Sequence, residues 1–172
     1  MPAVFFSGGP LRENCAMSTG ASQNVGQLLT KRAYRDPEVE AVFEPASDRR
    51  FSFRELNSRS NQVANALTGS GVSLGDRVGL LLMNGVEFVE SFFAAGKVGA
   101  VNVPLNWRLV ADELEFILHD AGVTVLIYGA DFAEIAAELR GRGDKTCLSH
   151  TSHAAYRPHS VALHRLPIRQ HT

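Results

Sequence analysis

Segments typical of buried strands alternate with segments typical of helices between residues 77 and 140 of this 172-residue chain. The strand-like segments are the apolar runs GDRVGLLLM (75–83), AVNVPL (100–105) and VTVLIYG (123–129). An almost wholly apolar run suits a strand that is covered on both faces, as in a parallel sheet. The alternation therefore predicts an α/β fold, with a mostly parallel sheet flanked by helices.

Three helices are expected around these strands. The segment 84–100 is apolar on more than one side, which predicts deep packing, and Asn84 stands three residues before Glu87, a helix-start signal. Its aromatic side chains are Phe88, Phe92 and Phe93. A second helix is expected over 111–122, closed by Gly122. A third is expected over 131–143, and Asp131 and Glu134 form its expected cap pair.

Two further helices and a hairpin are expected earlier in the chain. Residues 24–37 fit a short helix that Asn24 caps and Pro37 ends, because the residue before a proline avoids the helical region. The segments 39–45 and 49–53 fit the two strands of a hairpin.

The second of these helices is expected over residues 52–71. Ser52 and Glu55 form a capping box, in which each side chain satisfies a free backbone N–H at the helix start. Gly69 or Gly71 can take the left-handed position at its end. One stripe of this helix should face inward: Leu56, Ser60, Val63 and Leu67.

Three regions follow from these patterns. Residues 24–143 are expected to form an α/β domain, and residues 1–23 a disordered or non-native extension, with Met17 as a possible alternative start of the chain. Residues 144–172 are expected to be an irregular tail, since the periodicity stops there and the tail holds five of the six histidines and no acidic residue. Enrichment in His, Arg, Ser and Pro favours the hypothesis that this tail is translated out of frame.

Charge and cysteine content limit the class of protein. Residues 1–144 hold 18 acidic and 13 basic side chains, so the body lacks the basic surface of a nucleic-acid-binding protein. Two distant cysteines, Cys15 and Cys147, indicate a reducing compartment without a disulfide framework. The sequence shows neither a signal peptide nor an apolar run long enough to span a bilayer, so we expect a cytoplasmic protein.

One stretch, residues 75–128, resembles the N-terminal part of the adenylate-forming (AMP-binding) acyl-CoA synthetases, the fatty-acid–CoA ligases among them. The resemblance covers residues 24–141, about the first quarter of a family member. It rests on the order of several short motifs: Gly75-Asp76-Arg77, Asn84, Glu87-Phe88, Gly96 to Ala100, Val103-Pro104-Leu105-Asn106, Arg108-Leu109, Glu113-Leu114 and Ile117-Leu118.

The resemblance implies a reaction in which a carboxylate and ATP form an acyl-adenylate, whose acyl group then passes to the thiol of coenzyme A. It also implies a Ser/Thr/Gly-rich phosphate loop that ends in Lys-Gly, a magnesium ion, an acidic ribose-binding residue and a lysine in a mobile C-terminal domain. Residues 1–144 contain none of these elements. We therefore assign no catalytic, cofactor-binding or metal-binding residue, and expect this chain to bind no cofactor by itself.

Three conspicuous features of the body have simpler explanations than a catalytic site. The segment TGSGVSLG (68–75) follows a helix and lacks the ending of a phosphate loop, so it is expected to be a helix cap and turn. Trp107 and Arg108 are expected at the surface or in packing contacts. His119 stands at a helix C-terminus, where a cation is favourable.

The tail offers two further alternatives. Structural zinc sites prefer paired ligand knuckles, which the tail fits only loosely. The zinc-ligand candidates are Cys147, His150, His153 and His159. The basic residues are too sparse for a track along a phosphate backbone: Lys145, Arg157, Arg165 and Arg169.

Three functions remain open at this level: a truncated acyl-CoA synthetase that is inactive alone, one half of a split synthetase, and a non-catalytic binding or oligomerisation module. The expected partners are a separately encoded remainder or a second copy of the chain. Elements missing from the domain would leave apolar surface uncovered, and the helix with Phe88, Phe92 and Phe93 is the expected place.

Overall fold

The structure, a computed structural model, describes residues 24–142 and 147–151. Its elements follow one another in the order α1 (Val25–Arg35), β1 (Glu40–Glu44), β2 (Arg49–Ser52), α2 (Phe53–Gly69), β3 (Arg77–Leu81), α3 (Val86–Val98), β4 (Val101–Pro104), α4 (Ala111–Asp120), β5 (Val123–Gly129), the 3-10 turn η1 (Ala130–Phe132), α5 (Ala133–Gly141) and β6 (Cys147–Thr151). The α/β class expected from the sequence is confirmed.

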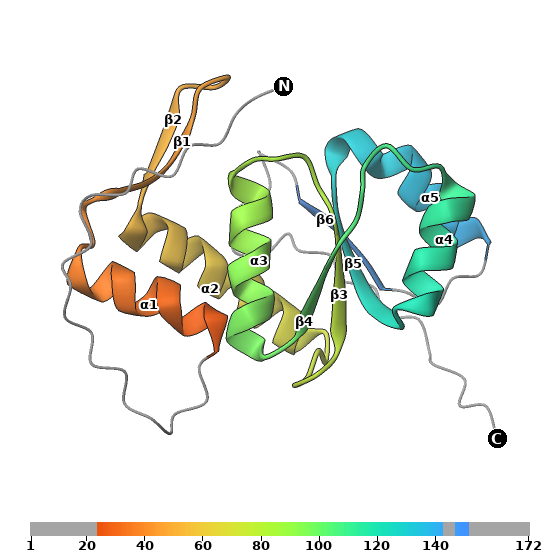
Figure 1. The fold of residues 1–172 in the computed structure, drawn as a ribbon, viewed down its shortest axis with the longest axis horizontal. Helices are drawn as coiled ribbons and strands as arrows, with labels where there is room; N and C mark the ends of the chain where they lie inside the picture. The colour runs from red at the N-terminus through yellow and green to blue at the C-terminus, as the bar shows by residue number, and fades with distance from the viewer. Residues whose placement is uncertain (1–23, 143–146, 152–172) are drawn as a thin grey trace.

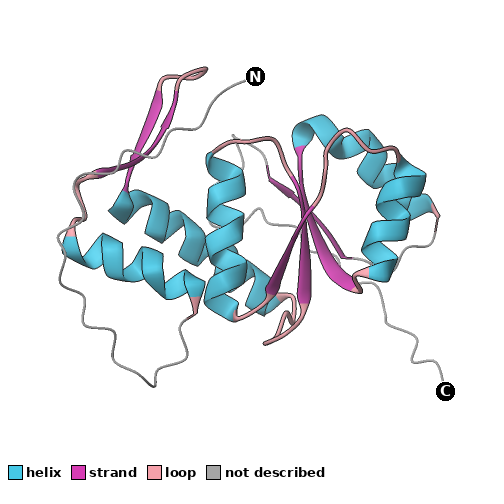
Figure 2. Ribbon diagram, in the orientation of Figure 1, coloured by secondary structure: helices cyan, strands magenta, loops and turns pink. Residues whose placement is uncertain are grey.

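The main sheet has the strand order β4-β3-β5-β6, and every pair in it is parallel. Figure 1 shows this sheet in the centre, with α1, α2 and α3 on one side and α4 and α5 on the other. The antiparallel hairpin β1–β2 stands apart from the main sheet, at the end of the molecule where α1 and α2 lie (Figure 2). The expected parallel sheet and the expected hairpin are both present.

Each face of the sheet has its own apolar core. Apolar side chains of α2 and α3 pack against β3 and β5 on one face, and those of α4 and α5 pack against the same strands on the other. Alternate residues of β3 serve the two cores, since Val78 and Leu80 lie in the first and Leu81 lies in the second. Burial on both faces explains why the strands are apolar throughout.

A third core holds the hairpin and α1 on the rest of the domain. Its buried members come from α1, β1, α2 and α3: Leu29, Ala41, Val42, Leu56, Val86 and Val89. The inward stripe expected on α2 is confirmed, because Leu56, Ser60, Val63 and Leu67 are all buried.

Two helix starts are as expected and two are not. The Asn24 side chain accepts a hydrogen bond from the Gly26 N–H, and Ser52 and Glu55 form the expected capping box. The prediction for Asn84 was wrong, because α3 begins at Val86 after Gly85 and has no cap from a neighbouring side chain.

The cap pair expected at the start of α5 was also wrong. Asp131 lies within η1, and α5 begins at Ala133 after Phe132, without a side-chain cap. The 3-10 turn takes the place of the expected first helical turn, so Asp131 does not stand at the N-cap position.

One strand was not expected. Residues Cys147–Thr151 form β6, which pairs with β5 in parallel, whereas the sequence analysis placed only an irregular tail there. The segment has no apolar alternation, so its strand character comes from backbone pairing along the edge of β5 and not from its side-chain pattern. The remaining expectations for residues 1–23 and 144–172, among them the alternative start at Met17 and the shifted reading frame, fall outside the described residues or are not tested by them, and stay predictions.

Candidate functional site

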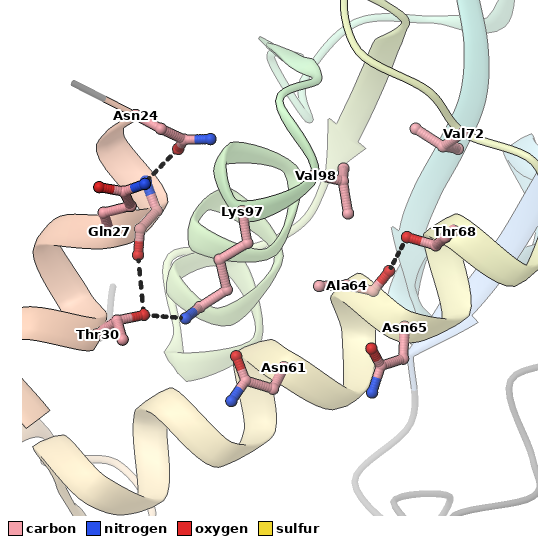
Figure 3. Close-up of a pocket in the computed structure, with 11 residues that line it drawn as sticks. Asn24, Gln27, Thr30, Asn61, Ala64, Asn65, Thr68, Val72, Lys97 and Val98 are labelled. Atoms are coloured by element: carbon pink, nitrogen blue, oxygen red, sulfur yellow. Dashed lines mark hydrogen bonds between the residues drawn. The ribbon is translucent and has the colours of Figure 1, made fainter. Parts of the chain in front are cut away.

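A polar cavity of about 670 Å³ lies between α1, α2 and α3 (Figure 3). Residues of all three helices and of the turn after α2 line it: Asn24, Gly26, Gln27, Thr30, Asn61, Ala64, Asn65, Thr68, Val72, Lys97 and Val98. Most of these are polar and uncharged, and Lys97 is the charged residue among them. The cavity is open to solvent, since polar side chains of its lining such as Gln27, Asn61 and Asn65 are exposed, and its lining is far more polar than that of a usual small-molecule site.

On one side of this cavity, α1 crosses α3 at two glycines, Gly26 and Gly96. A Cβ atom on Gly26 would lie 2.4 Å from the backbone nitrogen of Lys97, and one on Gly96 would lie 2.6 Å from Cγ1 of Val25. The two helix backbones therefore touch at a point where neither could carry a side chain. This contact brings Lys97 of α3 alongside Thr30, one turn further along α1.

The ammonium group of Lys97 is held by neutral oxygens. Its Nζ donates to Oγ1 of Thr30 at 2.6 Å and to Oδ1 of Asn57 at 2.8 Å. Partial burial lowers the pKa of Lys97, because desolvation disfavours the charged form. Within residues 24–142, Lys97 forms no ion pair, whereas Arg32, Arg49, Arg50, Arg54, Arg59 and Arg142 each contact a carboxylate.

Helix α2 supplies the opposite side of the cavity with amide groups. Asn61 and Asn65 are one helical turn apart, so both project toward the same side of α2, as Figure 3 shows. Thr68 follows on the same side, and its hydroxyl donates to the carbonyl of Ala64 at 3.0 Å. The arrangement offers a cation and several hydrogen-bonding groups, but the described lining contains no nucleophile paired with a base.

A second polar cluster joins the hairpin to α3. Oε1 of Glu44 accepts a hydrogen bond from the Val86 N–H at 3.0 Å, and so caps α3 from across the chain. Oε2 of Glu44 accepts from the Ser47 hydroxyl at 2.6 Å and from Nη2 of Arg49 at 2.5 Å. Arg49 also reaches Oε1 of Glu87 at 3.2 Å. This cluster supplies the helix cap that was expected from Asn84.

Burial alone would raise the pKa of Glu44, but hydrogen bonds from Ser47, the Val86 N–H and Arg49 outweigh it and hold that pKa below its ordinary value. The ionised form is therefore the one that stabilises the fold. Its contribution is complete above the unfolded-state pKa of about 4.3 and is lost as pH falls through the lower folded-state pKa.

We accordingly expect Glu44→Gln to lower the free energy of unfolding by about 1–3 kcal/mol at pH 7, since hydrogen bonds to a charged group are lost. The difference from wild type should shrink as pH falls below about 4.3. Urea titrations of the full chain between pH 7 and pH 3 measure it. Glu38→Gln is the control, because its ion pair with Arg54 is exposed and should contribute at most about 1 kcal/mol. A gap for Glu44→Gln that is constant with pH would contradict the assignment.

A buried ion pair joins α2 to α3. The side chain of Glu90 is 1% exposed, and Nε and Nη2 of Arg59 approach its two carboxylate oxygens. The guanidinium carbons of Arg59 and Arg49 lie 5.2 and 5.6 Å from the ring centre of Phe51, so this pair and the Glu44 cluster share one aromatic neighbour. Glu90 was not predicted from the sequence. An acidic residue in the middle of the most apolar helix was the available signal.

The three conspicuous features of the body lie where structural roles were expected. In the segment 68–75, Ser70 caps the end of α2 and Gly71 and Gly75 have positive φ, which confirms a cap and turn. Trp107 and Arg108 are in a surface turn and stack on each other, with 4.8 Å between the guanidinium carbon and the ring centre. His119 is exposed in the last turn of α4.

The candidate zinc ligands are not brought together by anything that the structure describes. The backbones of Cys147 and His150 are part of β6, and His153 and His159 lie outside the described residues. In the part of the chain that is described, no three His, Cys, Asp or Glu residues are grouped as metal ligands. The hypothesis of a zinc site in the tail therefore stays untested, as does the alternative of a basic tail that binds nucleic acid.

The apolar surface is not where we expected it. Phe88, Phe92 and Phe93 are half-buried, because the first two pack on the core of α2, α3 and the sheet and the third packs on the hairpin core. Among the described residues, the large apolar side chains that are exposed lie elsewhere, on other elements and in loops: Val25, Leu28, Tyr34, Val39, Leu74, Val101, Trp107, Val110 and Phe116. Among the described helices, none has both the length and the apolar character to span a bilayer.

Residues 29–166 match the AMP-binding enzyme family. The long-chain-fatty-acid–CoA ligase FadD13 of Mycobacterium tuberculosis H37Rv is 43% identical over 122 residues, which are 71% of this chain and 24% of that protein. The crotonobetaine/carnitine–CoA ligase of Salmonella paratyphi A is 39% identical over 138 residues, 78% of this chain and 26% of that protein. The fold is similar to the crystal structure of the N-terminal domain of FACL13 from M. tuberculosis, with TM-score 0.74, 38% identity and coverage of 87% of this chain and 39% of that one.

The chain spans about a quarter of the length of these curated relatives. The family match runs past residue 141, where the resemblance was expected to end, and includes β6. Strand order, helix placement and sequence identity therefore agree on one assignment. The chain belongs to the AMP-binding enzyme family, and its described residues have the fold of part of the N-terminal domain of the acyl-CoA ligases in that family.

Proposed function

We propose that this chain supplies the first part of the N-terminal domain of an acyl-CoA ligase and that the 172-residue polypeptide alone does not activate an acyl group. The complete reaction would convert a carboxylate, ATP and coenzyme A to acyl-CoA, AMP and pyrophosphate. The observation that carries the proposal is 43% identity to a fatty-acid–CoA ligase over a span that is 24% of that enzyme. A cytoplasmic location is part of the proposal.

The described residues support the proposal that the isolated chain is inactive. Adenylation needs donors around a triphosphate and positive charge near the reacting phosphorus. In residues 24–142, the glycine-rich segment 68–75 is a helix cap, and the Lys97 cavity has no companion arginine, second lysine or carboxylate in its lining to hold a triphosphate and its magnesium. We therefore propose that ATP, Mg²⁺ and coenzyme A bind only when further protein elements are present.

The surface supports a need for such elements. Among the described strands, β4 lies at one edge of the sheet, and Val101 on this strand is 50% exposed. An open edge with apolar residues is a template for a further strand or a second chain. The exposed side chains of Leu74 and Phe116 add apolar surface on other elements. A separately encoded remainder or a second copy would cover part of this surface.

The test is ATP-dependent release of pyrophosphate with a panel of fatty, aromatic and short-chain carboxylates. We expect no release above background from the purified 172-residue chain, and release when the chain is co-expressed with the part of a relative that follows the matched span. A matched co-expression with that part alone controls for its own activity. Release by the purified chain alone, at a rate proportional to its concentration, would refute the proposal.

A further inference from the structure

We propose that the cavity between α1, α2 and α3 binds a small polar anion, whose carboxylate or phosphate group contacts the Lys97 ammonium and whose uncharged part lies along the amides of α2. The inference goes beyond the proposed ligase function.

Charge is the first argument. The described lining of the cavity contains a cation and no carboxylate, and no ion pair to Lys97 occurs within residues 24–142. A half-buried ammonium group without a counter-ion is poorly compensated, since neutral oxygens replace only part of its hydration. A bound anion would complete that compensation with a charge-assisted hydrogen bond.

Hydrogen-bonding capacity is the second argument. An ammonium group has three N–H donors, and Thr30 and Asn57 accept two of them. The third is available to a ligand or to water. The two hydrogen bonds position the ammonium group between α1 and α2.

The lining decides the chemical class of the ligand. Its apolar side chains are Ala64, Val72 and Val98, which is too little apolar surface for a fatty acyl tail. Amide and hydroxyl groups of Gln27, Asn61, Asn65 and Thr68 suit instead a compact ligand with hydroxyl or amide groups of its own. A single positive charge selects an anion but offers little affinity, so a dissociation constant in the millimolar range is expected.

The experiment follows amide NMR shifts of the full chain during titration with inorganic phosphate and, separately, with acetate, at constant ionic strength. We expect saturable shifts of residues that line the cavity, and none with glycerol. Tighter binding of phosphate would identify a phosphorylated ligand, and tighter binding of acetate a carboxylate. Shifts that are unsaturable or spread over the whole surface for both anions would overturn the proposal.

Two pairs of variants test the role of charge. Lys97→Gln should weaken anion binding at least tenfold, whereas Lys31→Gln, which removes an exposed lysine of α1 outside the lining, should leave it unchanged. Asn61→Asp leaves Lys97 unchanged but places a carboxylate in the lining. Because this carboxylate repels an anion, the substitution should also weaken anion binding at least tenfold. Gln62→Glu adds the same charge on the next residue of α2, outside the lining, and is its control.

The second pair keeps the test decisive if Lys97→Gln unfolds the chain, because Asn61 is exposed on α2. Lys97→Arg should retain binding, since it keeps the charge. Equal anion affinity in wild type, Lys97→Gln and Asn61→Asp would overturn the proposal. That result would assign Lys97 to the packing of α1 on α3 alone.

Discussion

Arg59→Met is expected to lower the free energy of unfolding by about 3–5 kcal/mol, the largest effect that the structure predicts for a single side chain outside the apolar cores. The Glu90 carboxylate is 1% exposed and receives two hydrogen bonds from the guanidinium group. Methionine keeps most of the volume beside Phe51 but removes the charge that compensates this carboxylate. The cost comes from leaving Glu90 charged and buried without that compensation.

Substituting the other partner, Glu90, should lower the free energy of unfolding much less. The Arg59 side chain is 24% exposed, so in Glu90→Gln its charge can still reach water, and we expect a loss of about 1 kcal/mol. Urea unfolding of the full chain, followed by circular dichroism at pH 7, measures both variants. Arg54→Met is the matched control, because its partner Glu38 is exposed and the loss should stay below about 1 kcal/mol.

The double variant Arg59→Met/Glu90→Leu separates charge compensation from packing. Because it removes both charges, it should recover most of the stability lost in Arg59→Met. Equal losses for Arg59→Met and Arg54→Met would show that the buried carboxylate does not depend on the guanidinium group. The pair would then have no special part in holding α2 against α3.

Gly26→Ala is expected to destabilise the chain by about 1–3 kcal/mol or more, through the insertion of one methyl group between two helix backbones. The new Cβ would lie 2.4 Å from the nitrogen and 2.6 Å from the Cα of Lys97. Both are backbone atoms, so the clash can be relieved only by moving α1 away from α3. That movement would also stretch the hydrogen bond from Lys97 to Thr30.

The control for this prediction is Gly69→Ala at the end of α2, where a Cβ would meet no atom within 4 Å. Alanine should stabilise a helical position of this kind by up to about 1 kcal/mol relative to glycine. The two variants make the same chemical change with opposite expected signs. Urea unfolding of both distinguishes them, and a neutral Gly26→Ala would mean that α1 and α3 do not approach as closely as described.

Local signals in the sequence predicted the features whose determinants are a few residues apart. The capping box of Ser52 and Glu55, the Asn24 cap and the inward stripe of α2 all depend on neighbours within one or two helical turns. The parallel sheet was predictable for a related reason, because burial on both faces leaves each strand apolar along its length. Motif order over more than a hundred residues predicted the family.

Long-range contacts account for what the sequence analysis missed. The cap of α3 comes from Glu44, 42 residues before the N–H that it accepts from, so the local candidate Asn84 was wrong. Glu90 and Arg59 are 31 residues apart and showed no common pattern. Strand β6 was missed because it is defined by its pairing with β5 and has no alternation of apolar residues.

The sequence by itself therefore determined the fold class, the order of the helices and strands from α1 to α5 and membership in the AMP-binding enzyme family, since periodicity, caps and motifs depend on residues close together in the sequence. Only the tertiary structure decided which polar groups share a site. It placed Lys97 beside Thr30 and Asn57 in a cavity whose described lining has no carboxylate, because two glycines let α1 and α3 touch. Such a site depends on residues brought together by packing, and packing is not visible along the chain.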